Sequence, residues 1–251
     1  MFPILQIGPL ALQAPGLLLI LGVWFGLTTA ERYAARLKSA SNPIYNLVLL
    51  GLLAGIVGAR LAYAVQYRTI FLADPLSLVS LTPTMLNGEA GLTAGVLVAL
   101  ISANRKALPL WPTLDTLAVG LSIFFIAWHL ANFASGNAFG APTRLPWAVD
   151  LWGEQRHPVQ LYEMAAAIGI AILLLPRNNT PVLPGITFWS WVALSALARL
   201  LFELFRGDST TLIWNLHSAQ LFAWLAAGIA LWQIGLIRKR NRPPTPLHPD
   251  I

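Results

Sequence analysis

The segment Arg156-His157-Pro158-Val159-Gln160-Leu161-Tyr162-Glu163 leads directly into an apolar stretch that runs from Met164 to Leu175. A second polar piece, Arg144-Leu145-Pro146-Trp147, lies shortly before it. Polar and charged side chains at this density beside a membrane segment are costly unless they contact water, one another or a substrate. The segment therefore predicts a membrane helix whose entrance carries a functional or bracing site.

The composition of the whole chain supports a membrane protein. Of the 251 residues, 57% are hydrophobic and only 10% are charged, whereas a soluble domain carries about 25% charged residues. We therefore expect an all-α, polytopic membrane protein. The chain contains no cysteine, which excludes disulfides, a thiolate metal site and a cysteine nucleophile of its own.

Seven stretches are candidates for membrane-spanning helices, each of which needs about 20 predominantly apolar residues. The third candidate is short and begins in Asn87-Gly88-Glu89-Ala90-Gly91. A half-buried or broken helix is expected there, because irregular backbone is tolerated in a membrane only where it lines a cavity or packs within protein. The seven candidates are residues 14–30, 44–66, 90–103, 114–134, 159–176, 183–205 and 217–237.

The distribution of basic residues predicts the orientation of these spans. With the N-terminus outside and the C-terminus in the cytoplasm, ten of the sixteen Lys and Arg residues fall in inner loops and the C-terminal tail, as the positive-inside rule requires. The net charge of +6 is spread among apolar helices rather than gathered in a stripe, so it does not indicate nucleic-acid binding. We expect one membrane domain over residues 1–240 and a disordered tail over 241–251. The first apolar run is expected to be a retained helix, because its flanks lack the features of a cleaved signal.

The sixth candidate span ends with three charged residues that share one helix face. Arg199, Glu203 and Arg206 are spaced i, i+4 and i+7, which places them one above the other. One interpretation is an ion-paired cluster at the end of the helix. The other is an anion site, because guanidinium groups bind phosphate in a bidentate way.

The fourth candidate span ends with a second polar group. His129 and Asn132 are spaced i, i+3 and share a face, while Gly136 and Gly140 permit a turn or a close approach of the backbone. A single histidine near a helix end is more often structural than catalytic, although imidazole can exchange protons near neutral pH. Arg60 adds a further charge in the second candidate span.

Other polar and aromatic residues have structural interpretations. Asp115 opens the fourth candidate span, where an acidic residue complements the helix dipole. Trp147, Trp152 and Tyr162 flank a span as an interfacial aromatic belt does. The chain has no phosphate-binding glycine-rich loop, no H-E-x-x-H metal motif and no G-x-S-x-G motif.

The order of these motifs resembles that of prolipoprotein diacylglyceryl transferases, a family of bacterial inner-membrane enzymes. The similarity extends from about residue 45 to about residue 235, and the segment that begins at Arg156 is its most specific part. The pieces that carry the resemblance are Gly58-Ala59-Arg60-Leu61-Ala62-Tyr63, Asn132-Phe133 with Gly136 and Gly140, Pro142 to Ala148, Arg156 to Glu163, Arg199 with Glu203 and Arg206, and Ser218-Ala219-Gln220.

The resemblance implies a reaction at the outer leaflet of the bacterial cytoplasmic membrane. Members of the family transfer a diacylglyceryl group from phosphatidylglycerol to the thiol of the lipobox cysteine in the signal peptide of a preprolipoprotein. A thioether forms and glycerol-1-phosphate leaves. No metal ion and no cofactor is implied, and the thiol belongs to the substrate.

The resemblance also implies roles for individual residues. Arg199 is expected to bind the phosphate and contribute to catalysis, with Glu203 orienting it. Asn132 matches a functionally critical position of the family, as does Gly140. If the chain is an active transferase, His129 is expected to act as a base or as a weaker phosphate ligand. Further residues are expected to bind substrate or brace the chamber, namely Arg60, Arg206, His157, Gln160 and Tyr162.

The chain departs from the family pattern at four functional positions. Thr93 stands where the family has a histidine, His129 where it has an arginine, Asn137 where it has a glutamate, and Pro15 where it has a tyrosine. These departures leave two alternatives to the transferase: a divergent enzyme that acts on another acceptor, and a non-enzymatic protein that binds phospholipid. A transporter is disfavoured, because the polar residues gather toward one side of the membrane.

Overall fold

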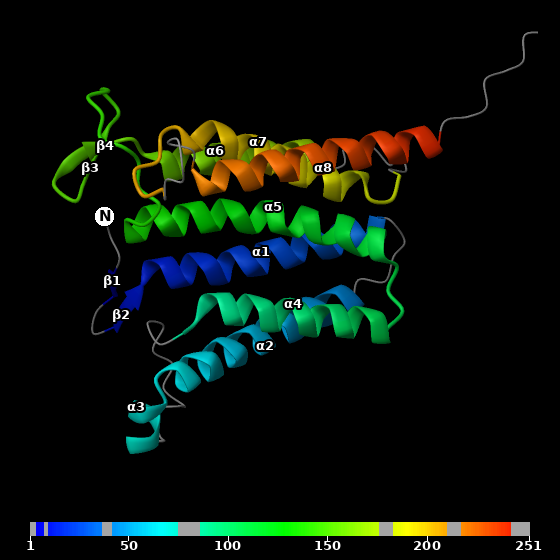
Figure 1. Cartoon of the computed structure of the whole chain (residues 1–251), viewed down its shortest axis with the longest axis horizontal. Coiled ribbons are helices and arrows are strands. Elements are labelled where there is room, and N and C mark those ends of the chain that lie inside the picture. The colour runs from blue at the N-terminus through cyan, green and yellow to red at the C-terminus, as the bar shows by residue number, and fades with distance from the viewer. Residues whose placement is uncertain are drawn as a thin grey trace, which may run out of the picture. The chain divides into compact units, whose positions relative to one another are not determined.

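The computed structural model describes residues 4–7, 10–36, 42–74, 86–175, 183–209 and 217–241, and most of these residues are helical (Figure 1). The expected helical architecture is confirmed, with two short antiparallel hairpins, β1–β2 and β3–β4, added to it. The elements are β1 (Ile4–Ile7), β2 (Leu10–Gln13), α1 (Ala14–Arg36), α2 (Asn42–Gln66), α3 (Arg68–Ala73), α4 (Gly88–Arg105), α5 (Leu110–Ser135), β3 (Val149–Leu151), β4 (Glu154–Arg156), α6 (Val159–Leu174), α7 (Ile186–Glu203) and α8 (Ser218–Arg240).

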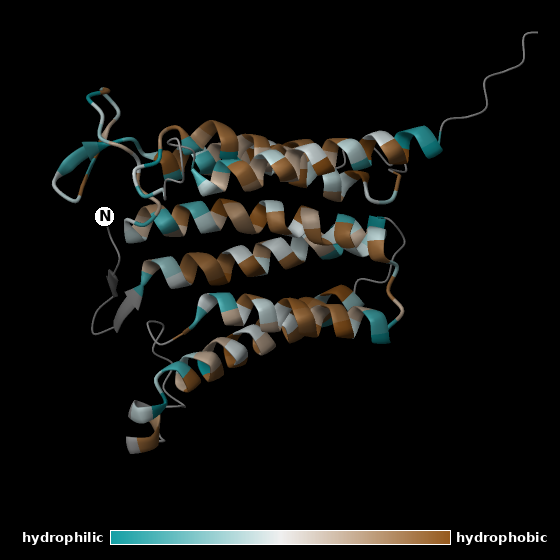
Figure 2. Ribbon diagram, in the orientation of Figure 1, coloured by the Kyte–Doolittle hydropathy of each residue, from teal (hydrophilic) through white to brown (hydrophobic). Residues whose placement is uncertain are grey.

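Five of the described helices, α1, α2, α5, α7 and α8, are long and apolar enough to cross a membrane. Helix α6 is apolar but has only 16 residues; at 1.5 Å per residue it is about 24 Å long, less than the roughly 30 Å hydrocarbon core of a bilayer. Figure 2 shows apolar residues along the helices and hydrophilic residues mainly at their ends. The chain is therefore a multi-pass membrane protein.

The expectation of a broken helix in the third candidate span is wrong. Helix α4 runs without interruption over 18 residues, and Asn87 caps it. The Asn87 side-chain oxygen accepts a hydrogen bond from the backbone N–H of Ala90 at 3.0 Å, which satisfies one of the free donors of the first helical turn. The glycines near its start pack against α2 instead of breaking the helix.

The chain divides into two compact units, residues 38–113 and residues 1–37 with 114–251. In the first of these, α2 and α4 lie unusually close together. A Cβ atom on Gly91 would lie 2.8 Å from the carbonyl oxygen of Gly55, and one on Gly95 would lie 2.8 Å from that of Gly51. Small residues at this spacing let two membrane helices approach until their backbones touch.

In the other unit, α5 lies between α1 and a layer formed by α6, α7 and α8 (Figure 1). A Cβ atom on Gly26 of α1 would lie 2.7 Å from the carbonyl oxygen of Gly120 of α5. On the opposite side of α5, the ring of Phe125 lies 5.9 Å from that of Trp191 in α7. Helix α5 is therefore the central element, and polar residues at its end can reach several neighbours.

The described residues also show how α7 is held at its start. The Asp115 carboxylate accepts hydrogen bonds from the backbone N–H groups of Gly185 (2.6 Å) and Phe188 (2.7 Å). The Tyr33 hydroxyl of α1 lies 3.0 Å from the Thr187 hydroxyl. Asp115 thus caps α7, whereas the sequence had suggested that it complements the dipole of its own helix. Of the predicted disordered tail, only Asn241 is described, and residues 242–251 lie outside the described residues.

Candidate active site

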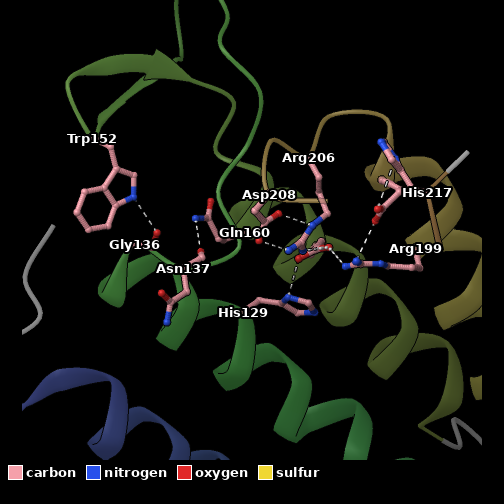
Figure 3. Close-up of polar contacts among 11 residues, drawn as sticks. His129, Gly136, Asn137, Trp152, Gln160, Arg199, Arg206, Asp208 and His217 are labelled. Carbon is pink, nitrogen blue, oxygen red and sulfur yellow. Dashed lines mark hydrogen bonds and ion pairs between the residues drawn. The ribbon is translucent and has the colours of Figure 1, made fainter. Parts of the chain in front are cut away.

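A buried carboxylate, Glu163, forms the centre of a charged cluster where α5, α6 and α7 come together. Figure 3 labels its partners His129, Arg199 and Arg206. Its Oε2 atom lies 3.1 Å from Nδ1 of His129. Its Oε1 atom accepts hydrogen bonds from Nη1 of Arg199 at 3.2 Å and from Nη1 of Arg206 at 3.3 Å. Glu163 is only 6% exposed, so one nearly buried carboxylate ties α5, α6 and α7 together.

A second buried carboxylate lies on the other side of Arg199. Glu203 is completely buried, and its Oε2 atom lies 2.9 Å from Nη2 of Arg199. Its Oε1 atom lies 3.5 Å from Nδ1 of His217, the N-cap residue of α8. The Arg199 guanidinium therefore bridges two carboxylates, and their positions fix its orientation.

Arg206 is held differently from Arg199. Helix α7 ends at Glu203, so Arg206 lies beyond the helix and forms a β-bridge with Gly140. Its guanidinium donates hydrogen bonds to both carboxylate oxygens of Asp208, at 2.9 and 2.7 Å. The expected single helix face for residues 199, 203 and 206 is thus interrupted, but both arginines still meet at Glu163.

The cluster borders a cavity of about 460 Å³. Arg199 keeps 36% of its side chain exposed, compared with 10% for Arg206. Apolar side chains such as Phe125, Ile170 and Trp191 form another part of the wall. The polar side chains that line the cavity include His129, Asn132, Asn137, Glu163, Arg199 and Arg206.

A close backbone contact holds the segment that follows α5 in place. A Cβ atom on Gly140 would lie 2.2 Å from the carbonyl oxygen of His157, so only glycine fits at this position. The backbone N–H of Ala141 bonds to Phe205 at 2.8 Å, and that of His157 bonds to Ala141 at 3.1 Å. The chain after α7 and the start of α6 are therefore locked against the loop that contains Gly140.

The structure separates the predicted site residues into two groups. His129, Asn132, Arg199 and Arg206 line the cavity, with Glu203 directly behind Arg199. The other predicted residues of this unit, Gly140, His157, Gln160 and Tyr162, are not among the residues that line it.

Two of the residues outside the lining make contacts that support the loops. Gln160 is fully buried, and its side-chain amide donates a hydrogen bond to the carbonyl of Asn137 at 2.7 Å. The Tyr162 hydroxyl accepts a hydrogen bond from the indole N–H of Trp147 at 2.8 Å. Trp152, on the β3–β4 hairpin, donates to the carbonyl of Gly136 at 3.2 Å.

Two further positions belong to the unit formed by residues 38–113. Arg60 is buried in α2, with its guanidinium carbon 5.4 Å from the ring centre of Phe71. The Thr93 hydroxyl, at the position where the family pattern has a histidine, donates a hydrogen bond to the backbone carbonyl of Glu89 at 2.8 Å. It is a local helix contact of α4.

Sequence reasoning did not include Glu163, Asp208 and His217 among the site residues. A signal for Glu163 was available, because an ionisable residue inside an apolar run is expected to have a partner. No such signal marked Asp208 or His217. Within the described parts of the chain, no group of three His, Asp or Glu side chains is arranged to hold a metal ion.

The helices and this cavity define a multi-pass membrane protein with a charged site built from α5, α6 and α7. Residues 3–235 match the family model of prolipoprotein diacylglyceryl transferase. The chain belongs to this family of membrane transferases of lipoprotein biosynthesis.

Individual relatives agree with the family match, and each is named phosphatidylglycerol–prolipoprotein diacylglyceryl transferase. The protein from Sinorhizobium medicae is 33% identical over 220 residues, which cover 81% of this chain and 78% of the relative. The protein from a Nostoc species is 28% identical over 260 residues, covering 96% and 91%. That from Clostridioides difficile is 26% identical over 197 residues, covering 78% and 79%.

Proposed function

We propose that this chain transfers the diacylglyceryl group of phosphatidylglycerol to the lipobox cysteine thiol of preprolipoproteins. The proposal rests on the position of Arg199. Its guanidinium borders the cavity and is oriented by two buried carboxylates. A guanidinium held in this way can contact a phosphate without first reorganising, which is the arrangement that stabilises charge developing in a transition state.

The reaction requires one bond to form and one to break. The substrate sulfur attacks the carbon of the diacylglyceryl group that is bonded to a phosphate oxygen. The bond between that carbon and that oxygen breaks, and glycerol-1-phosphate leaves. Negative charge grows on the phosphate as that bond breaks. Arg199 is the group placed to stabilise this charge, with Arg206 beside it and Asn132 as a neutral hydrogen-bonding group in the cavity wall.

The size and lining of the cavity suit the headgroup end of a phospholipid. Ligand cavities commonly measure about 300–1,000 Å³, and this one measures about 460 Å³. Its polar side chains would face the phosphate and the terminal glycerol, while Ile170 and the aromatic rings would face the start of the acyl chains. The rest of each acyl chain would remain in the lipid.

The proposed site also requires a particular topology. We propose seven spans, α1, α2 and α4 to α8, which would put the end of α5, the start of α6 and the end of α7 at the same side of the membrane. With the N-terminus outside, this is the outer leaflet of the bacterial cytoplasmic membrane. The many basic residues at the end of α8 would then lie inside, in accordance with the positive-inside rule.

The test is a transfer assay with the full chain in vesicles that contain phosphatidylglycerol and with a lipobox peptide as the acceptor. Mass spectrometry should detect the thioether product. Arg199→Gln should lower the rate at least 100-fold, whereas Arg238→Gln, on an exposed turn of α8, should leave it unchanged. Binding of phosphatidylglycerol without any thioether would support the non-enzymatic alternative, and a product formed only with another acceptor would support the divergent enzyme.

A further inference from the structure

The proposed reaction needs a group that accepts the proton of the substrate thiol. A thiol attacks as its thiolate, and a cysteine is mostly protonated at neutral pH. Within the cavity lining, Arg199 and Arg206 are permanently charged and can accept no proton. Glu163 is engaged by both arginines and by His129. Among the described residues of the lining, only His129 has a side chain that ordinarily exchanges protons near pH 7.

The geometry of His129 determines which of its nitrogens is available. Its Nδ1 atom lies 3.1 Å from Oε2 of Glu163, off the ideal line of a hydrogen bond. A lone pair so close to a carboxylate oxygen would be repelled, so the proton of the neutral ring belongs on Nδ1. The other ring nitrogen, Nε2, is then the acceptor, and His129 is among the residues that line the cavity.

The charged groups around His129 come from α6, from α7 and from the segment after α7. Glu163 faces it from α6, and Arg199 and Arg206 face the same carboxylate from α7 and from the segment after α7. The two guanidinium groups are matched by three carboxylates, those of Glu163, Glu203 and Asp208.

We propose that His129 is the catalytic base that takes the thiol proton, and that Glu163 is a positioning residue that orients the imidazole ring. This inference rests on the proposed function. The proton moves from sulfur to Nε2, the carbon–sulfur bond forms, and the carbon–oxygen bond to the phosphate breaks. The imidazolium then passes its proton to the leaving glycerol-1-phosphate, so that protons and charge balance.

The same arrangement gives His129 a second effect. Once protonated, it adds a positive charge to the cavity wall at the moment when negative charge grows on the phosphate. An interaction that strengthens only in the transition state increases the rate without tightening substrate binding. The proposal therefore predicts an effect on the turnover rate and little effect on the affinity for phosphatidylglycerol.

Two substitutions distinguish a base from a structural ion pair and from a phosphate ligand. His129→Arg keeps a cation beside Glu163 but cannot accept a proton, and His129→Gln keeps a polar side chain without either property. Both should keep the wild-type KM for phosphatidylglycerol in the transfer assay. Both should lose about 100-fold or more in the transfer rate at pH 7, which is the usual contribution of a general base. If His129→Arg transfers within threefold of the wild-type rate, the residue acts as a cation and the proposal is overturned.

The pH dependence supplies a readout that a structural role would not move. With a thiol pKa of about 8.5, the thiolate fraction of the peptide rises about 25-fold between pH 7 and pH 9. The peptide then needs no base, so the ratio of the wild-type rate to the His129→Gln rate should fall by about 10-fold over this range. A constant ratio would overturn the base role. If the wild-type chain forms no thioether, the proposed function itself is overturned. The wild-type measurement alone decides this, whereas the variants test the role of His129.

Discussion

Arg199 and Glu203 lie one turn apart on α7, and an Nη2–Oε2 contact of 2.9 Å joins them. Glu203 is completely buried, whereas Arg199 reaches the cavity with 36% of its side chain exposed. The carboxylate thus serves as a fixed support for a guanidinium whose other face is open.

Replacing Glu203 by Ala should cost both stability and activity. Removal of one partner of a buried ion pair typically costs about 3–5 kcal/mol, and a value near the lower end is expected because Arg199 can turn toward the cavity. Denaturation in detergent micelles measures the stability, and the transfer assay measures the activity. The control Glu89→Gln changes an exposed acid at the start of α4 and should leave both unchanged. An unaltered denaturation midpoint together with a wild-type transfer rate for Glu203→Ala would show that the pair supports neither the fold nor the site.

Gly140→Ala should disrupt the site, because its new methyl group would lie 2.2 Å from the carbonyl oxygen of His157. The loop would have to move, which we expect to cost about 3 kcal/mol, the upper end of the usual range for overpacking, and to abolish transfer. A matched control is Gly228→Ala in α8, where a Cβ atom meets nothing within 4 Å. That substitution should be neutral or stabilising. Comparable transfer rates for the two variants would contradict the proposed locking of the loop.

Asp115→Ala should destabilise the protein without altering the chemistry. The substitution removes the acceptor for the backbone N–H groups of Gly185 and Phe188, which we expect to cost about 2 kcal/mol. The affected end of α7 is opposite to the end that carries Arg199. A lower unfolding temperature with a wild-type transfer rate at low temperature is therefore expected. The control Asp150→Ala changes the exposed residue of strand β3 and should unfold as the wild type does. Loss of transfer in a stable Asp115→Ala variant would argue against a purely structural cap.

The proposed topology can be tested because the chain contains no cysteine. Single cysteines introduced at Asp150 and at Asn104 would probe the hairpin after α5 and the end of α4. In intact cells, an impermeant maleimide should label Asp150→Cys and should leave Asn104→Cys unlabelled until the membrane is opened. The reverse pattern would place the site at the cytoplasmic side and contradict the proposed orientation.

The helices could be predicted from the sequence because apolar length depends only on local composition. Each of the seven predicted spans falls on a helix, and the contact between Arg199 and Glu203 follows from their i, i+4 spacing. The broken third span was a wrong prediction, because glycine has two uses in membrane helices. In Gly91 and Gly95 it serves the close packing of α2 and α4.

The remaining contacts could not be read from spacing, because they join residues far apart in the chain. Glu163 meets partners 36 and 43 residues away, and Asp115 caps a helix that begins about 70 residues later. A glycine is required at position 140 because the backbone of His157 packs against it. Such contacts depend on how the helices pack, and the sequence pattern reports only on each helix by itself.

The most direct test of the account is the position of the lipid phosphate. A cryo-electron microscopy structure of the chain in nanodiscs of phosphatidylglycerol would show it. The account predicts a phosphate within hydrogen-bonding distance of Arg199, inside the cavity that His129 and Asn132 also line. A headgroup bound elsewhere, with Arg199 still held only by Glu163 and Glu203, would contradict the proposed site.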